Sequence, residues 1–485
     1  MTSPGTRPAS QRLVTEETVD DHITRVGNAT YAPVDAVDSK VDKTTSNVRL
    51  YGTDGLGNQA TVGYGTPANA NTIAYRTTNG RLKVGAPTDA DDATTKAYVD
   101  ALGGGGGASS LGELSVASAP IPAPYGPPIT ITEAAASTTS ITDGVLTARD
   151  NPLFRYVGLN NRGDTGSHYY FARLTGSPAG TASNPWLVMF DYEGSEFEIK
   201  AWTASSPRGE YRLWIDGQPT TPMLTALGAS GAWAIKVRMP NAQRRRIVLE
   251  VDSGFNFGGI WTPPGATLSA SSVPVGAKKL AVLGDSLVWG AGIVASGQQA
   301  LGFAFQLGRL LGWDVTNLGI GGTGWATDVT TGVTAVRFSQ RLADLYTAAP
   351  DVVLIPGSQN DKAAAAGAIN TEVSASIAAI KTNLPNAKIV LASTLFPATP
   401  TTARGGFDTA RRAVMDAEVK SAVDATTGVS YIDASGWFTG TGRVGTPDGG
   451  NADWFRTALD WAHPSAEGHT YLARRFAAEL KRIVG

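Results

Sequence analysis

The chain has 485 residues, which is too long for one ordinary hydrophobic core and therefore predicts two to four domains. Its formal net charge is −2 and it contains no long basic run, which argues against binding of nucleic acid or of a membrane surface through charge. Cysteine is absent, which excludes disulfides and thiolate metal sites, and the four histidines are too few and too scattered to predict a zinc site.

The N-terminal region, residues 1–102, is predicted to have little core of its own. It is poor in large aliphatic residues, and short alternating runs such as NTIAYR and GRLKVG are separated by turn signals. A segment of this kind usually needs other copies of itself or a larger assembly. Residues 87–102 predict a short helix, and the five glycines Gly103–Gly107 begin a flexible linker over residues 103–119.

Residues 80–101, GRLKVGAPTDADDATTKAYVDA, are similar to a segment common in phage tail fibres. The alternative interpretation is a polar linker helix of any multidomain protein. The resemblance implies that residues 1–102 attach the chain to other tail proteins of a virion, that the chain forms a homotrimer, and that it acts at the host cell surface. Residues 1–17 lack the apolar core of a signal peptide, and no stretch of about 18 apolar residues occurs. We therefore expect neither signal-directed export nor a membrane span.

Residues 120–270 predict a β-sandwich, jelly-roll-like, because short β-branched and aromatic runs alternate with Gly, Pro, Asn and Ser. Tyr211, Leu213 and Ile215 alternate with polar or aromatic neighbours, which is the two-residue period of a half-buried strand. The aromatic side chains of this region either fill the core of the sandwich or stack on sugars.

Residues 271–485 alternate apolar runs with helical stretches, which predicts a parallel sheet with helices on both faces. The predicted strands are KLAVLG, WDVTNLGI, DVVLIPG, KIVLAST and VSYIDA, and the predicted helices cover residues 301–312, 335–349, 365–384, 405–425 and 467–484. Ligands of such sheets bind beyond the carboxyl ends of the strands. Ser286 falls at such an end, in the run LAVLGDSLVWG.

A serine hydroxyl becomes a useful nucleophile only when a base removes its proton, so Ser286 needs a histidine within reach. The run DWAHPSAEGH supplies His463, with Asp460 three residues earlier. A carboxylate at that spacing is suited to hold the imidazole in the tautomer that leaves Nε2 free as a base. The second histidine of this run, His469, falls in the last helix, where packing or solvent contact is the favoured role.

Acyl transfer also requires hydrogen-bond donors aimed at the developing oxyanion. The run NLGIGGTG places a glycine turn after the second predicted strand of this region, where a backbone N–H can approach a ligand. The run PGSQND places the side-chain amide of Asn360 after the third predicted strand.

The four blocks GDS, the glycine turn, the Asn–Asp pair and DxxHP, in this order, resemble the SGNH hydrolase family, also called GDSL esterases, over residues 278–485. The resemblance implies an α/β/α flavodoxin-like domain with Ser286 as nucleophile, His463 as base and Asp460 as the orienting acid. It also implies an oxyanion hole made by the backbone N–H groups of Ser286 and Gly322 and by the side chain of Asn360. No metal or organic cofactor is implied.

Three acidic or polar residues beside these blocks have other expected roles. Ser358 departs from the family pattern, because many relatives have glycine two residues before the asparagine. Asp285 and Asp361 are expected to cap helices or to brace loops. The run GIGGTG also matches the dinucleotide fingerprint G-x-G-x-x-G, with Asp344 20 residues later. Because Asp344 sits in a helical pattern and the turn follows the second strand, an oxyanion role explains the glycines better.

The sequence therefore predicts an esterase of a phage tail that removes O-acyl groups, O-acetyl above all, from glycans of the bacterial cell envelope. A β-sandwich before this hydrolase fold also resembles family-two carbohydrate esterases. Three alternatives stay open. They are a receptor-binding adhesin with a hydrolase-like fold, a lipase-type esterase acting on envelope lipids, and a cellular esterase without a virion.

Overall fold

The computed structural model describes residues 48–53, 59–64, 72–73, 129–159, 163–164, 169–171, 184–203, 209–221, 223–293, 299–328, 337–395, 409–438 and 463–485. The chain divides into two compact units, Met1–Gly105 and Gly106–Gly485. In the described part of the chain, no helix combines the length and the apolar character needed to span a bilayer.

The first unit contains a small three-stranded sheet in the order β1-β2-β3. Strands β1 (Val48–Thr53) and β2 (Gln59–Tyr64) pair antiparallel, and β3 (Thr72–Ile73) lies parallel to β2. The runs that predicted short strands are thus partly present as strands. The predicted helix over 87–102 and the glycine linker lie outside the described residues.

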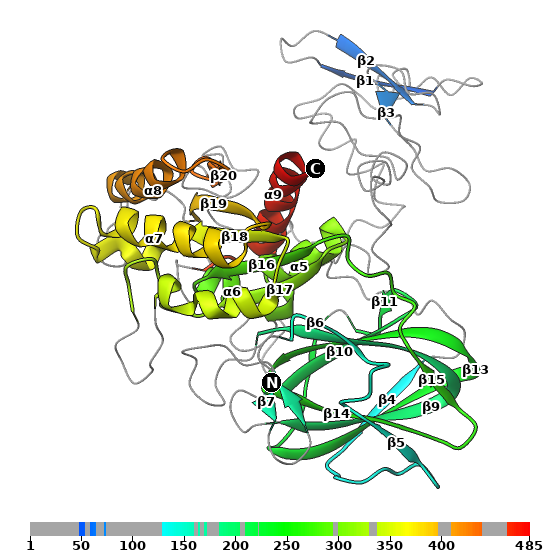
Figure 1. The fold of residues 1–485 in the computed structure, drawn as a ribbon. Helices are drawn as coiled ribbons and strands as arrows, with labels where there is room; N and C mark the ends of the chain where they lie inside the picture. The colour runs from blue at the N-terminus through cyan, green and yellow to red at the C-terminus, as the bar shows by residue number, and fades with distance from the viewer. Residues whose placement is uncertain are drawn as a thin grey trace, which may run out of the picture. The chain divides into compact units, whose positions relative to one another are not determined.

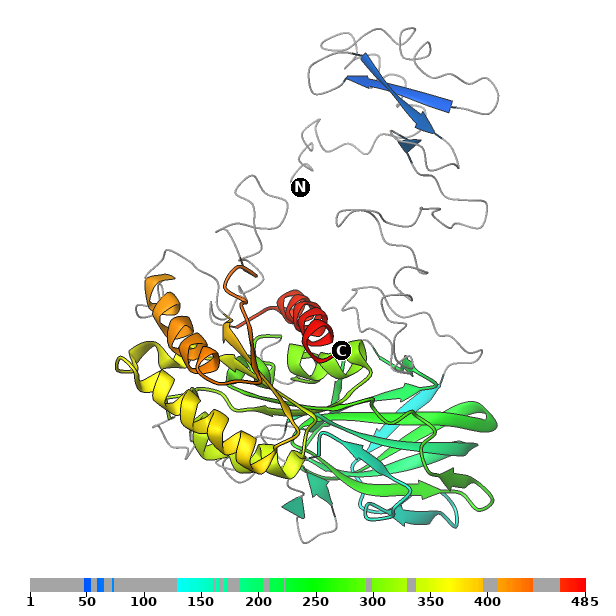
Figure 2. The ribbon, with the colours of Figure 1, turned by 45° about the horizontal axis from the view of Figure 1, so that its top comes forward.

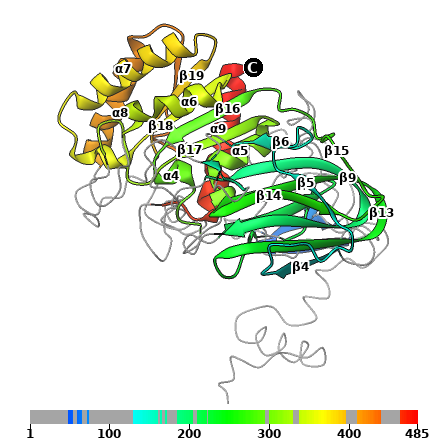
Figure 3. The same ribbon diagram turned by 60° about the horizontal axis from the view of Figure 1, so that its bottom comes forward.

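Twelve strands of the second unit, within the described residues up to 269, form one hydrogen-bonded antiparallel network, called here the β domain (Figure 3). They are β4 (Thr130–Ala134), β5 (Val145–Ala148), β6 (Arg155–Val157), β7 (Gly163–Asp164), β8 (Tyr170–Phe171), β9 (Trp186–Thr203), β10 (Gly209–Ile215), β11 (Gln218–Pro219), β12 (Thr225–Ala226), β13 (Gly231–Ser253), β14 (Phe255–Thr262) and β15 (Thr267–Ser269).

Strands β9 and β13 are longer than the sequence suggests. The runs WLVMFDYE and FEIKAWTA are one continuous strand, and so are WAIKVRM and RRIVLEV. The register of the β9–β13 pair shifts between Arg238, which pairs with Glu196, and Gln243, which pairs with Gly194, so β13 carries extra residues between these two pairs. A bulge of this kind bends a strand and increases its twist. The turn signals inside both runs therefore mark a bend rather than the end of a strand.

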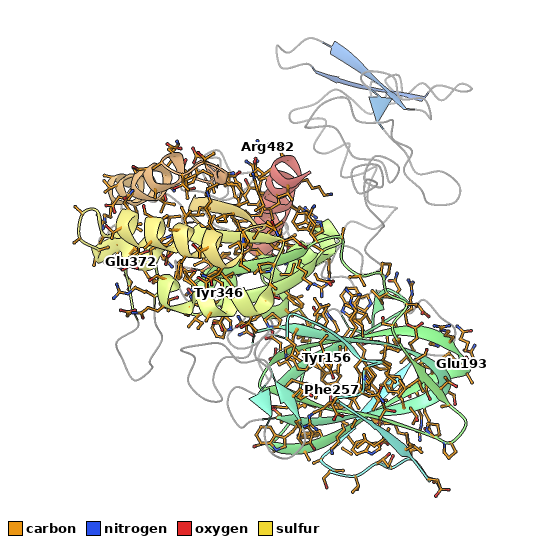
Figure 4. All side chains as sticks on the ribbon, viewed as in Figure 1. Tyr156, Glu193, Phe257, Tyr346, Glu372 and Arg482 are labelled. Carbon is orange, nitrogen blue, oxygen red and sulfur yellow. The ribbon has the colours of Figure 1, made fainter. Side chains whose placement is uncertain are left out.

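The two halves of the β9–β13 pair enclose an apolar core. The N-terminal half of β9 pairs with the C-terminal half of β13, next to β10, and the other halves lie next to β4 and β14. Phe154 packs edge-on against both Phe190 and Phe257, at centroid distances of 5.7 and 5.3 Å. Figure 4 shows Phe257 in the interior of this domain. The predicted sandwich thus corresponds to two layers that share a core but belong to one network through β9 and β13.

Strand β10 corrects one sequence expectation. Its alternating pattern predicted a half-buried strand, yet all seven residues from Gly209 to Ile215 are buried. Tyr211, Leu213 and Ile215 enter the core of the β domain, as the pattern predicted. Arg212 and Trp214 are buried as well, because a second domain covers the other face of the strand.

That second domain, called here the α/β domain, is built on a five-stranded sheet in the order β17-β16-β18-β19-β20 with all neighbours parallel. Its strands are β16 (Lys279–Gly284), β17 (Asp314–Gly319), β18 (Val352–Gly357), β19 (Lys388–Thr394) and β20 (Val429–Ile432). Its helices are α4 (Ser286–Trp289), α5 (Phe303–Leu311), α6 (Leu342–Ala348), α7 (Ala368–Asn383), α8 (Thr409–Asp424) and α9 (Ala466–Val484), with 3-10 helices η2 (Gln299–Leu301), η3 (Phe338–Arg341) and η4 (Gln359–Ala363).

Helices cover both faces of this sheet, as predicted (Figures 1 and 2). Alternate strand residues separate into two apolar clusters: Leu280 and Val282 of β16 pack with α5 and α9, whereas Ala281 and Leu283 pack with α6, α7 and α8. This two-residue alternation explains why each strand reads as a continuous apolar run. The strand order reverses at β16, so the carboxyl ends of β16, β17 and β18 meet at a topological switch point, where ligands of such folds bind.

A buried ionic cluster joins the two domains. Glu250 of β13 is fully buried and accepts hydrogen bonds from Arg212 of β10 and from Arg309 of α5. The indole of Trp214 donates to the same carboxylate, at 2.9 Å, and both guanidinium groups lie over its ring. Burial raises the pKa of Glu250, but the two guanidinium groups and the Trp214 hydrogen bond together lower it below its ordinary value. The two domains are therefore packed against each other through charges that water does not reach.

Polar contacts close to β17 continue this interface. Arg155 of β6 forms an ion pair with Asp314 at the start of β17. At the other end of the strand, the side-chain amide of Asn184 donates to the carbonyl oxygen of Asn317 at 2.6 Å. Figure 4 shows Tyr156, the neighbour of Arg155, on the side of the β domain nearest the parallel sheet.

Candidate active site

Ser286 begins the short helix α4 directly after β16. The preceding residue, Asp285, caps this helix, because its Oδ1 accepts the backbone N–H of Leu287 at 2.9 Å. Asp285 is buried, and burial raises the pKa of its carboxyl, while hydrogen bonds from Ser358 and Leu287 lower it. Asp285 therefore has the bracing role expected from the sequence, and Ser286 is held at the carboxyl end of the sheet.

His463 lies next to Ser286, although 177 positions separate them in the chain. Its Nε2 is 2.8 Å from the Oγ of Ser286, within hydrogen-bond distance. His463 precedes α9, whose N-cap is Ser465. The third predicted member of this group, Asp460, lies outside the described residues.

His469 is a structural residue of this region. It is fully buried in α9, where its Nδ1 accepts the backbone N–H of Phe303 at 3.2 Å and its Nε2 contacts the carbonyl oxygen of Ala291 at 2.9 Å. Both contacts are satisfied by the neutral ring with its proton on Nε2. Burial lowers the pKa of His469 to about 4, so the ring is neutral at pH 7. The imidazole thus holds the segment after α4 to the start of α5.

The glycine turn after β17 lies against Ser286. An added Cβ at Gly321 would be 3.6 Å from the Cβ of Ser286, so the turn and the serine are in van der Waals proximity. Gly322 has a φ of +79°, a conformation that a residue with a side chain rarely adopts. The structure therefore brings the turn predicted to carry the Gly322 donor next to the predicted nucleophile.

Asn360 lies on η4, after β18, and its amide is held by the same turn. Its Nδ2 donates to the carbonyl oxygen of Thr323 at 2.9 Å. A primary amide carries a second N–H, which this contact does not use. The next residue, Asp361, accepts the backbone N–H groups of Trp325 and Ala326 at 2.8 and 2.9 Å. Asp361 thus braces the two loops against each other, as expected from the sequence.

Arg341 is a residue of this site that the sequence did not suggest. It is fully buried, and its guanidinium donates to the carbonyl oxygens of Leu318 at 2.8 Å and Gly284 at 2.9 Å, and to the hydroxyl of Thr323 at 3.1 Å. Burial lowers the pKa of Arg341 to about 10, against the opposing effect of Asp344 and Asp285. It ties the ends of β16 and β17 together, immediately before Ser286 and the glycine turn.

The position of Asp344 also bears on the rejected dinucleotide interpretation. Asp344 is buried in α6, next to Arg341, and not at the end of a strand, where a ribose would have to meet it. A hydroxyl within reach of an imidazole, beside a glycine turn that holds a side-chain amide, is instead an arrangement that supports acyl transfer.

Residues 282–471 match the family of GDSL-like lipases and acylhydrolases. The C-terminal part of the chain is a GDSL-like hydrolase domain. The match includes Ser286, Asn360 and His463, and it extends from β16 into α9. The sequence prediction of a GDSL hydrolase in this part of the chain is thereby confirmed.

Solved structures similar to this one include two family two carbohydrate esterases. The enzyme from Clostridium thermocellum in complex with cellohexaose has a TM-score of 0.51 at 16% identity, over 68% of this chain and 99% of that one. The enzyme from Cellvibrio japonicus has a TM-score of 0.50 at 15% identity, over 73% and 98%. The salicylyl-acyltransferase SsfX3 from a tetracycline biosynthetic pathway has a TM-score of 0.51 at 14% identity, over 70% and 98%.

At such identities the likeness concerns the fold. Because it extends over two thirds of the chain or more, it is longer than the hydrolase domain alone and reaches into the β domain. No curated protein sequence matches this chain.

Proposed function

We propose that this protein is a serine ester hydrolase that removes O-acyl groups, mainly O-acetyl, from glycans of the bacterial cell envelope. The observation that carries the proposal is the 2.8 Å contact between the Nε2 of His463 and the Oγ of Ser286. The proposal is supported by the glycine turn, which lies against Ser286, and by the Asn360 amide, which is hydrogen-bonded to Thr323 of that turn.

The reaction proceeds in two steps. In the first, His463 takes the hydroxyl proton as the Oγ of Ser286 attacks the ester carbonyl, and the oxyanion is held by the N–H groups of Ser286 and Gly322 and by the Asn360 side chain. The ester C–O bond then breaks, and the alcohol leaves with the proton from His463. In the second step, His463 takes a proton from a water molecule as the water oxygen attacks the acyl carbonyl. The bond between the acyl carbon and the Oγ of Ser286 then breaks, His463 returns the proton to Oγ, and the carboxylic acid leaves.

Asp460 is assigned the role of orienting His463, on the basis of its spacing in the sequence alone. The other groups of the proposed mechanism belong to residues that the structure describes. No step of it calls for a metal ion or an organic cofactor.

The glycan substrate is supported by two features of the architecture. The fold likeness to family two carbohydrate esterases includes the β domain as well as the hydrolase domain, and one of those structures holds cellohexaose. In this chain the buried cluster around Glu250 holds the β domain against the α/β domain, so a glycan could contact both domains at once. We propose an acetyl group by analogy with the family two carbohydrate esterases, whose fold this chain shares.

The N-terminal region supports a further proposal about location. Residues 80–101 are similar to a segment of phage tail fibres, so we assign the protein to a phage tail, attached through residues 1–102 as a homotrimer. Mass spectrometry of purified virions and light scattering of the full chain test these two points. A chain that is absent from virions and monomeric in solution would favour a cellular esterase.

The catalytic proposal is tested by hydrolysis of p-nitrophenyl acetate and octanoate with the wild type, Ser286→Ala and Ser376→Ala. Ser376 is a matched control, because it is a fully buried serine of the same domain, on α7. We expect acetate hydrolysis by the wild type and by Ser376→Ala, and a loss of at least a thousandfold in Ser286→Ala. Release of acetate from acetylated envelope polysaccharide then tests the glycan.

Two outcomes would replace the proposal. A strong preference for octanoate would favour a lipase-type esterase acting on envelope lipids. A wild type that hydrolyses neither ester but binds host cells would favour a receptor-binding adhesin.

A further inference from the structure

Ser358 occupies the position where many GDSL relatives have glycine, and its hydroxyl lies between three loops of the active site. It is almost fully buried, at 1% exposure, and follows β18 as the N-cap of η4. Its hydroxyl therefore does not contact bulk water. Its hydrogen-bond partners inside the domain all belong to loops of the candidate site.

The first contact is with the nucleophile loop. The Oγ of Ser358 is 2.7 Å from the Oδ2 of Asp285, the residue that directly precedes Ser286. The other carboxylate oxygen of Asp285 caps helix α4. Asp285 thus connects Ser358 to the backbone that carries the nucleophile.

The second and third contacts are with the oxyanion loops. The backbone N–H of Asn360 donates to the Oγ of Ser358 at 3.1 Å, and the Oγ lies 3.0 Å from the carbonyl oxygen of Thr323. That carbonyl also accepts the side-chain amide of Asn360. Ser358 and Thr323 therefore hold Asn360 by its backbone and by its side chain.

A serine hydroxyl has one proton, so it can donate to only one of the two acceptors at a time. The carboxylate of Asp285 is the closer acceptor, and hydrogen bonds to a charged acceptor are the stronger ones. The proton therefore belongs to the Asp285 contact, and the lone pairs face the N–H of Asn360. This arrangement makes a single chain from Leu287 N–H through Asp285 and Ser358 to Asn360.

We infer that Ser358 is a positioning residue of the oxyanion hole, which fixes the distance between the Asn360 amide and the Ser286 nucleophile. The inference rests on the proposed esterase function. Two other braces among the described residues make different links. Asp361 joins the η4 loop to Trp325 and Ala326, and Arg341 joins the ends of β16 and β17. Ser358 joins Asp285 directly to the Asn360 backbone.

A displaced donor weakens transition-state binding more than substrate binding, because the oxyanion forms fully only in the tetrahedral intermediate. We expect Ser358→Ala to lower kcat/KM for p-nitrophenyl acetate about tenfold to hundredfold. Ser358→Thr keeps the hydroxyl, and threonine tolerates the extended backbone at this position, where φ is −114° and ψ is 133°. Ser358→Thr should therefore retain most of the activity.

The test adds a readout that a merely structural role would not change. Phenylboronic acid forms a tetrahedral adduct with an activated serine, so its affinity reports on the oxyanion hole without turnover. The dissociation constant is measured by calorimetry for the wild type, Ser358→Ala, Ser358→Thr and Ser376→Ala. We expect it to rise in Ser358→Ala by the same factor by which kcat/KM falls, at a temperature where thermal melting shows that all four proteins are folded.

A double variant locates the effect. If Ser358 acts through Asn360, the loss caused by Ser358→Ala should shrink to about threefold or less when Asn360 is already alanine. The inference is overturned if Ser358→Ala keeps the boronate affinity and kcat/KM within twofold of the wild type. It is also overturned if the two single losses multiply in the double variant, or if Ser358→Ala loses activity only in proportion to folded protein.

Failure of the esterase proposal gives a different pattern. A wild type that turns over no ester but binds the boronate through Ser286 still allows the Ser358 comparison, and the proposed function alone is then wrong. A wild type that does not bind the boronate has no oxyanion hole for Ser358 to position, and the inference is wrong as well.

Discussion

Gly292 and His463 are so close that a side chain on the glycine would meet the histidine. A Cβ at Gly292 would lie 2.5 Å from the Cβ of His463 and 2.6 Å from the carbonyl oxygen of Pro464. Gly292 also has a φ of +101°. The segment that follows the nucleophile helix thus forms the surface on which His463 rests.

We expect Gly292→Ala to lower kcat/KM at least tenfold, because the added methyl group must displace His463 from Ser286. Gly428→Ala is the matched control: its φ is +82°, but an added Cβ there has nothing within 4 Å. Both variants carry similar backbone strain, and only the first touches the site. Ester hydrolysis and thermal melting of the pair measure this, and equal activities in the two variants would contradict the role of the close approach.

Asn360→Ala removes the side-chain donor proposed for the oxyanion. We expect kcat to fall about 10²- to 10³-fold, the usual cost of one such donor, with little change in melting temperature. Asn383→Ala on α7 is the control, since its amide donates to the carbonyl oxygen of Ala379 and its side chain hydrogen-bonds to Tyr346, and neither partner belongs to the candidate site. A loss of less than about fivefold in Asn360→Ala would place the oxyanion elsewhere.

His469 predicts a pH dependence of stability. Its pKa is lowered to about 4 in the folded protein, from an ordinary value of 6.5, because the ring is buried. The unfolded chain therefore binds a proton between pH 6.5 and 4 that the folded chain does not bind, and stability is lost as the pH falls through this window. The contribution amounts to about 2 kcal/mol between pH 7 and pH 5.

Urea unfolding of the wild type and of His469→Gln at pH 7 and pH 5 isolates this contribution, because all other titrating groups are shared. We expect the variant to be less stable at pH 7, since it loses the contacts to Ala291 and Phe303. Between pH 7 and pH 5, however, its free energy of unfolding should fall by about 2 kcal/mol less than that of the wild type. Equal decreases in the free energy of unfolding of the two proteins would show that the pKa of His469 is not lowered in the folded protein.

Glu250→Gln tests the buried cluster between the domains. Removing this charge leaves Arg212 and Arg309 buried without their shared carboxylate, and we expect a cost of about 3–5 kcal/mol in urea unfolding. Glu196→Gln is the control, because its carboxylate is 29% exposed and pairs with Lys236 and with the exposed Arg238. Ion pairs that water reaches contribute about 0–1 kcal/mol. Similar small costs for both variants would mean that the cluster does not join the domains.

The sequence by itself determined the architecture of the hydrolase domain and most of its candidate site. Each apolar run of residues 279–432 became a parallel strand within a residue or two of its predicted bounds, because a strand buried on both faces must be apolar throughout. Ser286, the glycine turn and Asn360 each follow a strand end, and parallel strands bring their carboxyl ends to one edge. Their positions after strand ends therefore predicted that these residues lie at the same edge of the sheet.

Only the tertiary structure determined the burial and the long-range contacts that the local sequence pattern does not specify. Arg212 and Trp214 read as an outward face of β10, and they are buried only because another domain covers them. The 335–349 segment, predicted as one helix, is η3 followed by α6 where it is described, since Arg341 turns inward to the strand-end carbonyls. The Ser358 hydroxyl, read as a departure from a family pattern, meets Asp285 from 73 positions away. Such contacts depend on distances between loops, and these are fixed by the packing of the whole sheet rather than by any stretch of sequence.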